Sequence, residues 1–217
     1  MSKVNKISIN RLVKGPQPKT VKFIFTRLLL IWVLTVSLAE AADKQGQYAV
    51  RGVGLVSCKL FISEKAARGD VYLMTAAWVD GYISGTNQHA DNTYDVLSFE
   101  STELLMNVLE KHCKQYPDDP VFGVVASLFK KLQSDRLVSY SEKITIEEGK
   151  RNAQLYKEVV QRLQNALKDK GYYSGPANGS FTGETQAAVA KFQKSIEFEA
   201  TGFPDQLTLW RLMRKDN

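Results

Sequence analysis

A series of short helical patterns, each ended by a glycine-containing break, fills the C-terminal quarter of this 217-residue chain. The first pattern has apolar residues four apart, which places them on one face of a helix: Leu155, Val159, Leu163 and Leu167. Gly171 is placed to end that helix, and a turn-rich stretch follows at 174–179. A second stripe comprises Thr185, Ala188, Val189 and Phe192, and Pro204 opens a third short helix. The pattern predicts three short helices around a small apolar core.

These helices and breaks also carry short motifs in a fixed order. The motifs are Leu163-Gln164, Gly171-Tyr172-Tyr173-Ser174-Gly175, Asn178-Gly179-Ser180-Phe181, Ala188-Val189, Phe192-Gln193 and Thr201-Gly202. The series resembles the three-helix peptidoglycan-binding domain of bacterial wall hydrolases and envelope proteins. Asn178 stands where that family usually has Asp, and Thr182-Gly183 shifts a glycine by one position. The resemblance implies that residues 155–214 form a peptidoglycan-binding domain.

Three residues of this segment are predicted to contact peptidoglycan: Tyr173, Asn178 and Gln193. Tyr172 and Tyr173 are adjacent, so the end of a helix cannot bury both rings equally, and one ring is expected to stay partly exposed. Asn178 and Gln193 are predicted to form a polar rim beside it. The residues assigned to the core are Phe181, Val189 and Phe192.

The first 41 residues have the pattern of a secretory signal peptide. Residues 1–27 hold seven basic residues and no acidic one, an 11-residue apolar run follows at 28–38, and Ala39-Glu40-Ala41 fits a cleavage site. An uncleaved anchor is the alternative, although the run is shorter than the roughly 20 residues that span a bilayer. Cleavage predicts a periplasmic or secreted protein, associated with the cell wall and not held in a membrane.

Removing this segment changes the charge balance of the chain. The whole chain has a formal net charge of +6. Residues 1–41 hold seven of the 29 basic residues and one of the 23 acidic residues, so residues 42–217 carry 22 of each. A neutral chain lacks the basic footprint that nucleic-acid binding requires. No nucleic-acid partner is therefore expected.

Residues 42–137 are predicted to form a helical domain that contains both cysteines, Cys58 and Cys113. In an exported chain the two cysteines are expected to form a disulfide, with two buried free thiols as the alternative. Helices are expected at 54–67, at 71–86, after the capping residue Ser101, and from Pro120 onward, with Asp119 as the N-cap. The stripe predicted to be buried on the second of these comprises Met74, Ala77, Trp78, Gly81, Tyr82 and Gly85, with the glycines admitting another helix closely. Residues 138–154, rich in charge, are interpreted as a linker, which makes the fold all-α.

Three further motifs mark this helical domain. They are Ser57-Cys58-Lys59-Leu60-Phe61, Trp78-Val79-Asp80-Gly81-Tyr82-Ile83-Ser84-Gly85, and His112-Cys113-Lys114-Gln115-Tyr116-Pro117. Together they are similar to motifs of small periplasmic all-helical proteins of the HdeA-like group. The resemblance implies a disulfide that ties the first helix to the third. It also implies a chaperone-like or interaction domain, with an envelope protein of unidentified kind as a second partner.

The sequence offers little that supports catalysis. Two histidines, His89 and His112, are a poor supply of zinc ligands, and no metal or cofactor is expected. The S-x-x-K match at 127–130 lies in an apolar helix and lacks its companion motifs. The carboxylates that leave glycan cleavage open are Asp80, Asp91, Asp95 and Glu103. We predict a non-catalytic envelope protein, with a peptidoglycan hydrolase, or an accessory subunit of one, as the alternative.

Overall fold

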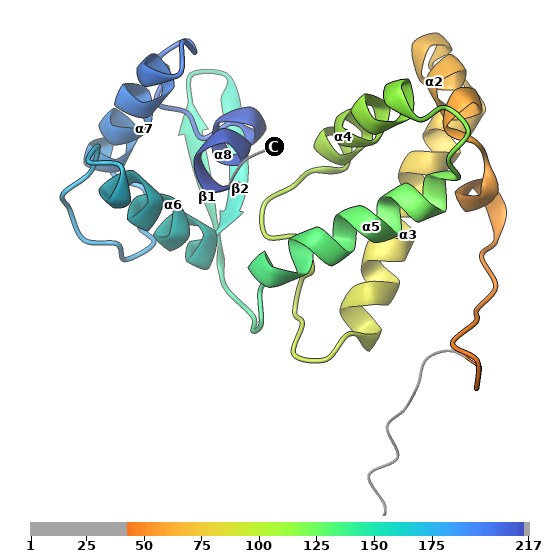
Figure 1. The fold of residues 1–217 in the computed structure, drawn as a ribbon. Helices are drawn as coiled ribbons and strands as arrows, with labels where there is room; N and C mark the ends of the chain where they lie inside the picture. Colours follow the sequence, from red (N-terminus) through yellow and green to blue (C-terminus); the bar gives the residue numbers. More distant parts are fainter. Residues whose placement is uncertain (1–42, 215–217) are drawn as a thin grey trace, which may run out of the picture. The chain divides into compact units, whose positions relative to one another are not determined.

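The computed structural model describes residues 43–214, and most of these residues lie in helices (Figure 1). The predicted signal peptide at residues 1–41 lies outside the described residues. Within the described part, no helix is both long and apolar enough to cross a membrane. Two apolar cores organise this part of the chain, and they define a helical region at 50–137 and a C-terminal region at 138–214.

The helical region begins with a short 3-10 helix, η1 (Gly52–Leu55). Four α-helices follow: α2 (Cys58–Ala67), α3 (Asp70–His89), α4 (Thr102–Gln115) and α5 (Val121–Leu132). The predicted cap of the third helix is confirmed, because the Ser101 side chain accepts a hydrogen bond from the backbone N–H of Leu104. Ser57 caps α2 in the same way. The fourth helix begins one residue later than expected, since Pro120 is its N-cap.

The predicted disulfide is present and joins α2 to α4. Cys58 and Cys113 lie 4.8 Å apart at their Cα atoms, and both are fully buried. They belong to the first core, whose other members are Phe61, Val79, Val96, Leu97, Leu105, Met106, Leu109, Val121, Val125, Phe129 and Leu132. The link from the first α-helix to the third, which the HdeA-like resemblance implied, is therefore confirmed as a disulfide pairing.

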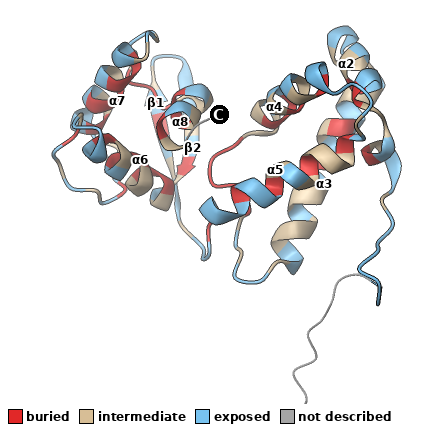
Figure 2. Cartoon of the chain, in the orientation of Figure 1, coloured by how far each residue is buried: buried red, intermediate tan, exposed pale blue. Residues whose placement is uncertain are grey.

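The predicted buried stripe of α3 is wrong in its phase. Thr75 and Val79 are buried, whereas Met74 is 56% exposed and Gly81 is exposed (Figure 2). A Cβ atom at Gly81 or Gly85 would meet nothing within 4 Å, so no other helix packs closely against these glycines. The aromatic rings explain why the buried face of α3 differs from the predicted one. Trp78 and Tyr82 stack on one another and lie edge-on to Phe122 of α5, while the face centred on Val79 enters the core.

The predicted linker contains a β-hairpin, so the chain is mostly helical rather than all-α. Strand β1 (Lys143–Glu148) pairs antiparallel with β2 (Arg151–Tyr156), and Ile144 lies opposite Leu155. Gly149 adopts a positive φ of 59° in the turn. Apolar Ile144 and Ile146 alternate with polar residues, which is the two-residue period of a strand. A search for helical stripes alone cannot detect that period.

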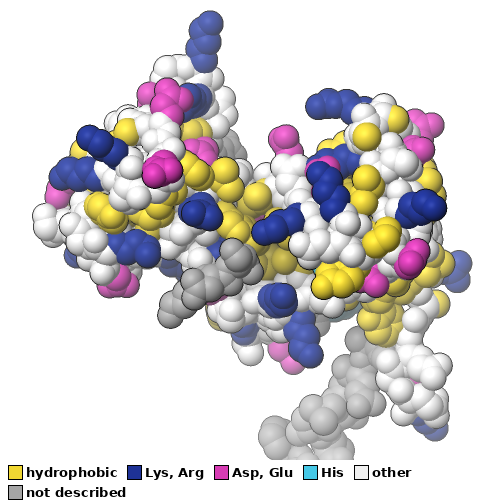
Figure 3. Space-filling view, turned by 45° about the horizontal axis from the view of Figure 1, so that its top comes forward, with side chains coloured by type: hydrophobic (Ala, Val, Ile, Leu, Met, Phe, Trp, Pro, Cys, Tyr) yellow, Lys and Arg dark blue, Asp and Glu magenta, His cyan; other side chains and the backbone are white. Residues whose placement is uncertain are grey.

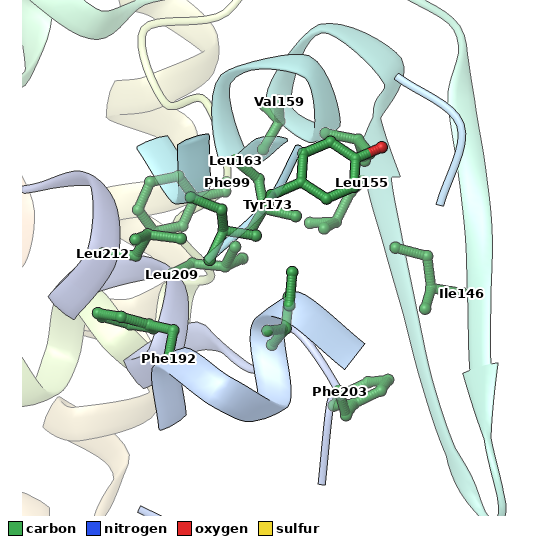
Figure 4. Packing of buried hydrophobic residues seen from close by; sticks show 14 of the residues in the cluster. Phe99, Ile146, Leu155, Val159, Leu163, Tyr173, Phe192, Phe203, Leu209 and Leu212 are labelled. Carbon is green, nitrogen blue, oxygen red and sulfur yellow. The ribbon is translucent and has the colours of Figure 1, made fainter. Parts of the chain in front are cut away.

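After the hairpin the chain forms the three expected helices: α6 (Lys157–Asp169), α7 (Gly183–Ser195) and α8 (Gln206–Met213). Leu155 lies in β2 rather than in the first helix. The third helix begins at Gln206, with Asp205 as its N-cap, rather than at Pro204. Figure 4 shows the second core, to which residues from outside the three helices contribute. These additional core residues are Phe99, Leu137, Ile146 and Leu155, which precede α6, and Tyr173 and Phe203, which lie in the loops between the helices.

Direct contacts join the segment before α4 to both ends of α8. The Gln206 side-chain amide donates to the backbone oxygen of Phe99 (2.8 Å), and its oxygen accepts from the N–H of Ser101 (2.7 Å). The Arg214 guanidinium forms ion pairs with Glu100 and Asp135 and lies over the Phe99 ring. Residues 50–214 accordingly belong to one compact unit.

Candidate functional site

The loop between α6 and α7 is held by one buried glutamine, Gln164. Its side-chain oxygen accepts a hydrogen bond from the backbone N–H of Gly179 (2.9 Å). Its amide nitrogen donates to the backbone oxygen of Ser180 (2.9 Å) and to the hydroxyl of Thr185 (3.1 Å). Both polar atoms of a fully buried side chain are thus paired, which fixes the turn around Asn178 and Gly179 to the helix.

The loop between α7 and α8 is held in the same way by Gln193. Its side-chain oxygen accepts from the backbone N–H of Gly202 (2.8 Å), and its amide donates to the backbone oxygen of Phe203 (2.9 Å) and the hydroxyl of Thr208 (3.1 Å). Each glutamine therefore binds a glycine N–H, the next residue's carbonyl and a buried threonine. The C-terminal region is built from a repeated helix-turn unit.

The two glycines of the repeat occupy equivalent positions. Gly179 and Gly202 have φ values of +77° and +74°, which side-chain-bearing residues rarely adopt. A Cβ at Gly179 would lie 2.6 Å from the backbone oxygen of Lys157, and one at Gly202 would lie 2.8 Å from that of Gln186. Lys157 and Gln186 lie seven residues before Gln164 and Gln193, respectively. We call these two buried glutamines the latch glutamines. The repeat can be found in the sequence as Leu163-Gln164 and Phe192-Gln193, each followed by a glycine and a threonine.

The structure corrects two of the three predicted wall-contacting residues. Gln193 is only 1% exposed and all its polar atoms have partners in the protein, so its predicted place on a polar rim is wrong. Tyr173 is buried in the second core (Figure 4), and its hydroxyl donates to the backbone oxygen of Pro176 (3.1 Å). Both residues support the fold of the module and present no free group to a ligand.

The third predicted residue, Asn178, is exposed at the tip of the first loop. Its side-chain oxygen accepts from the N–H of Ser180 (2.9 Å), which shapes the turn in the way an Asp would. Of the two adjacent tyrosines, Tyr172 is the more exposed, and its ring lies edge-on to Phe192 at 5.9 Å. Asn178 and Tyr172 are therefore the accessible members of the predicted surface.

Two of the four carboxylates considered for catalysis, Asp95 and Asp80, accept structural hydrogen bonds. Asp95 accepts hydrogen bonds from Asn87 and from the hydroxyl of Tyr156, which ties the loop before α4 to the hairpin. Burial, and then the nearby Asp95 carboxylate, raise the pKa of Tyr156 above its usual range. Asp80 accepts from the Thr102 hydroxyl (2.6 Å). Across residues 43–214, no group of three or more His, Cys, Asp or Glu side chains could hold a metal ion.

The comparison with protein families gives a match over the three C-terminal helices. Residues 157–212 match the family described as "Putative peptidoglycan binding domain". The match begins at the first residue of α6 and ends within α8, so it covers both helix-turn units. Neither a curated protein nor a solved structure gives a match. The resemblance of residues 42–137 to the HdeA-like group has no family match and stays a prediction.

Proposed function

We propose that this chain is an exported, non-catalytic envelope protein that binds peptidoglycan through its C-terminal region. The observation that carries this proposal is the family match over 157–212, on a segment whose two loops keep their buried glutamine latches. An intact fold is what presentation of a binding surface requires. A cell-wall association follows from the same match, and export follows from the pattern of residues 1–41.

The helical region is proposed to be the part that the wall-bound protein displays to another envelope protein. Its disulfide suits an oxidising compartment outside the cytoplasm. Several large apolar side chains of this region remain exposed, including Leu55, Leu73 and Met74. A chaperone-like or interaction role requires such a surface and requires no catalytic group.

Sedimentation with purified sacculi tests the wall-binding proposal. The full chain is expected to sediment with sacculi and to be released by an excess of soluble peptidoglycan fragments. Asn178→Ala should weaken binding, whereas Asn178→Asp, which keeps the acceptor for Ser180, should retain it. If the full chain stays in the supernatant, or soluble fragments do not compete, the proposal is wrong.

Zymography on the same sacculi tests the non-catalytic assignment against the hydrolase alternative. We expect no cleared band in the gel at the position to which the protein migrates. Clearing that disappears in Asp80→Asn or Glu103→Gln would show a hydrolase. A matched substitution of an exposed carboxylate in the hairpin, Glu147→Gln, controls for loss of charge alone.

A further inference from the structure

A cleft of about 510 Å³ lies between α4 and α8, a volume typical of small-ligand sites. On α4 its lining residues are Leu104, Asn107, Val108 and Lys111, which share one helical face. On α8 and just after it they are Leu207, Trp210, Arg211 and Arg214, spaced in the same way. Lys170, Phe192 and Ile196 complete the lining. The cleft thus takes residues from both regions of one compact unit.

Basic side chains line this cleft, and no acidic residue does. Arg214 is already paired, with Glu100 and Asp135. Lys111, Lys170 and Arg211 are exposed, and none of them forms an ion pair with another residue in the span 43–214. Three cations without an ion-pair partner around one cleft favour an anionic occupant.

The floor between these cations is apolar. Leu104, Val108 and the half-buried Trp210 ring contribute to it, and Trp210 packs against both cores. Figure 3 shows basic side chains beside hydrophobic surface on the visible face of the molecule. A ligand that suits this cleft combines carboxylates with small apolar groups. The peptide stem of peptidoglycan has that composition, because it combines alanine methyl groups with carboxylate-bearing residues, whereas the glycan strand is a polar saccharide.

We propose that the cleft between α4 and α8 binds the acidic peptide stem of peptidoglycan, with Lys111, Lys170 and Arg211 as the carboxylate-binding residues. The proposal rests on the proposed function and names the part of the polymer that is recognised. Arg211 presents a planar fork that can bind a carboxylate in bidentate fashion, and the two lysines act as point charges. Lys111 belongs to the helical region, outside the family match, so this region takes part in wall binding.

The test compares the full chain with its triple variant Lys111→Gln, Lys170→Gln, Arg211→Gln on two matrices. One matrix is intact sacculi, and the other is the peptide-free glycan strands that an amidase releases from sacculi, immobilised on beads. The control variant, Lys150→Gln, Lys191→Gln, Lys194→Gln, has the same change in charge, and its exposed residues lie outside the cleft. All six positions are on the surface, and thermal unfolding verifies that each variant is folded.

The triple variant is expected to bind intact sacculi about tenfold more weakly than the wild-type chain, while the control is unchanged. Wild-type binding to the peptide-free matrix should fall to the level of the triple variant. Equal binding of the wild-type chain to both matrices, or full binding by the triple variant, would overturn the peptide-stem assignment and leave wall binding intact. Failure of the wild-type chain to bind intact sacculi would overturn both proposals.

Discussion

The two cores of this protein are held together by different means. In the helical region a disulfide links α2 to α4 inside the apolar core. The C-terminal region contains no cysteine, and two buried glutamines hold its loops to its helices instead. A disulfide stabilises mainly by restricting the unfolded chain, whereas a buried hydrogen-bonded side chain acts in the folded state. The two regions should therefore differ in their sensitivity to reductant and to polar-to-apolar substitution.

The largest effect is expected from Phe192→Ala, which empties part of the second core. Phe192 is buried against the other helices, and loss of such a side chain costs about 3–5 kcal/mol. Chemical denaturation of the variant should show the C-terminal region unfolding first, with the disulfide still formed. Val138→Ala, at an exposed position, should change stability by no more than about 0.5 kcal/mol. Equal effects of the two substitutions would contradict the assigned core.

Removal of the disulfide should affect the other region. Cys58→Ala with Cys113→Ala opens a link between residues 55 apart in sequence, and the chain-entropy account gives a loss of about 4 kcal/mol at most. Unfolding of the helical region should then shift, and addition of reductant to the wild-type chain should reproduce the shift. The contrast between the regions would be contradicted if reductant destabilised the C-terminal helices as strongly as it destabilises the helical region.

Substitution of a latch glutamine is expected to have an intermediate effect. Gln193→Leu fills the same volume but leaves the N–H of Gly202 and the carbonyl of Phe203 without partners, at about 1–3 kcal/mol for each unpaired group. Gln164→Leu should have a similar effect through Gly179 and Ser180. The control is Gln154→Leu on the exposed side of β2. A stable Gln193→Leu protein, measured by thermal unfolding, would show that the latch is dispensable.

The smallest effect concerns the hydrogen bond between Tyr156 and Asp95, which joins the two regions. Because the pKa of Tyr156 is raised in the folded chain, its stabilising contribution is complete below the ordinary tyrosine pKa of 10.0 and declines as pH rises above that value. Tyr156→Phe should cost about 1 kcal/mol at neutral pH. The stability difference between the two proteins should shrink above pH 10, and a difference independent of pH would contradict this assignment.

The two regions also differ in how far their sequences predict their structures. In the C-terminal region the glycine breaks and apolar stripes predict three helices correctly, because Gly171, Gly179 and Gly202 occupy turns with positive φ. The same motifs gave the wrong role to Gln193. Polarity suggested a surface position, whereas the N–H of Gly202 and the hydroxyl of Thr208 that pair with it lie nine and 15 residues further along the chain, in the next loop and in α8. Such pairing depends on tertiary contacts that a single sequence does not display.

In the helical region the sequence predicts helices, a cap and a disulfide, but not which face of α3 is buried. Trp78 and Tyr82 are large enough to pack from the side of the helix, so the centre of the buried face lies at Val79. The cleft between α4 and α8 could not be predicted either. Its residues on the two helices are separated by about a hundred positions, and the contacts of Gln206 and Arg214 with the segment before α4 help to bring them together.

Sedimentation with purified sacculi tests the central claim most directly, when the full chain is compared with residues 43–137, which retain the disulfide-bonded core. Peptidoglycan binding through the C-terminal region predicts that the full chain sediments and that residues 43–137 stay in the supernatant. The assignment is contradicted if residues 43–137 sediment as completely as the full chain, or if the full chain remains in solution.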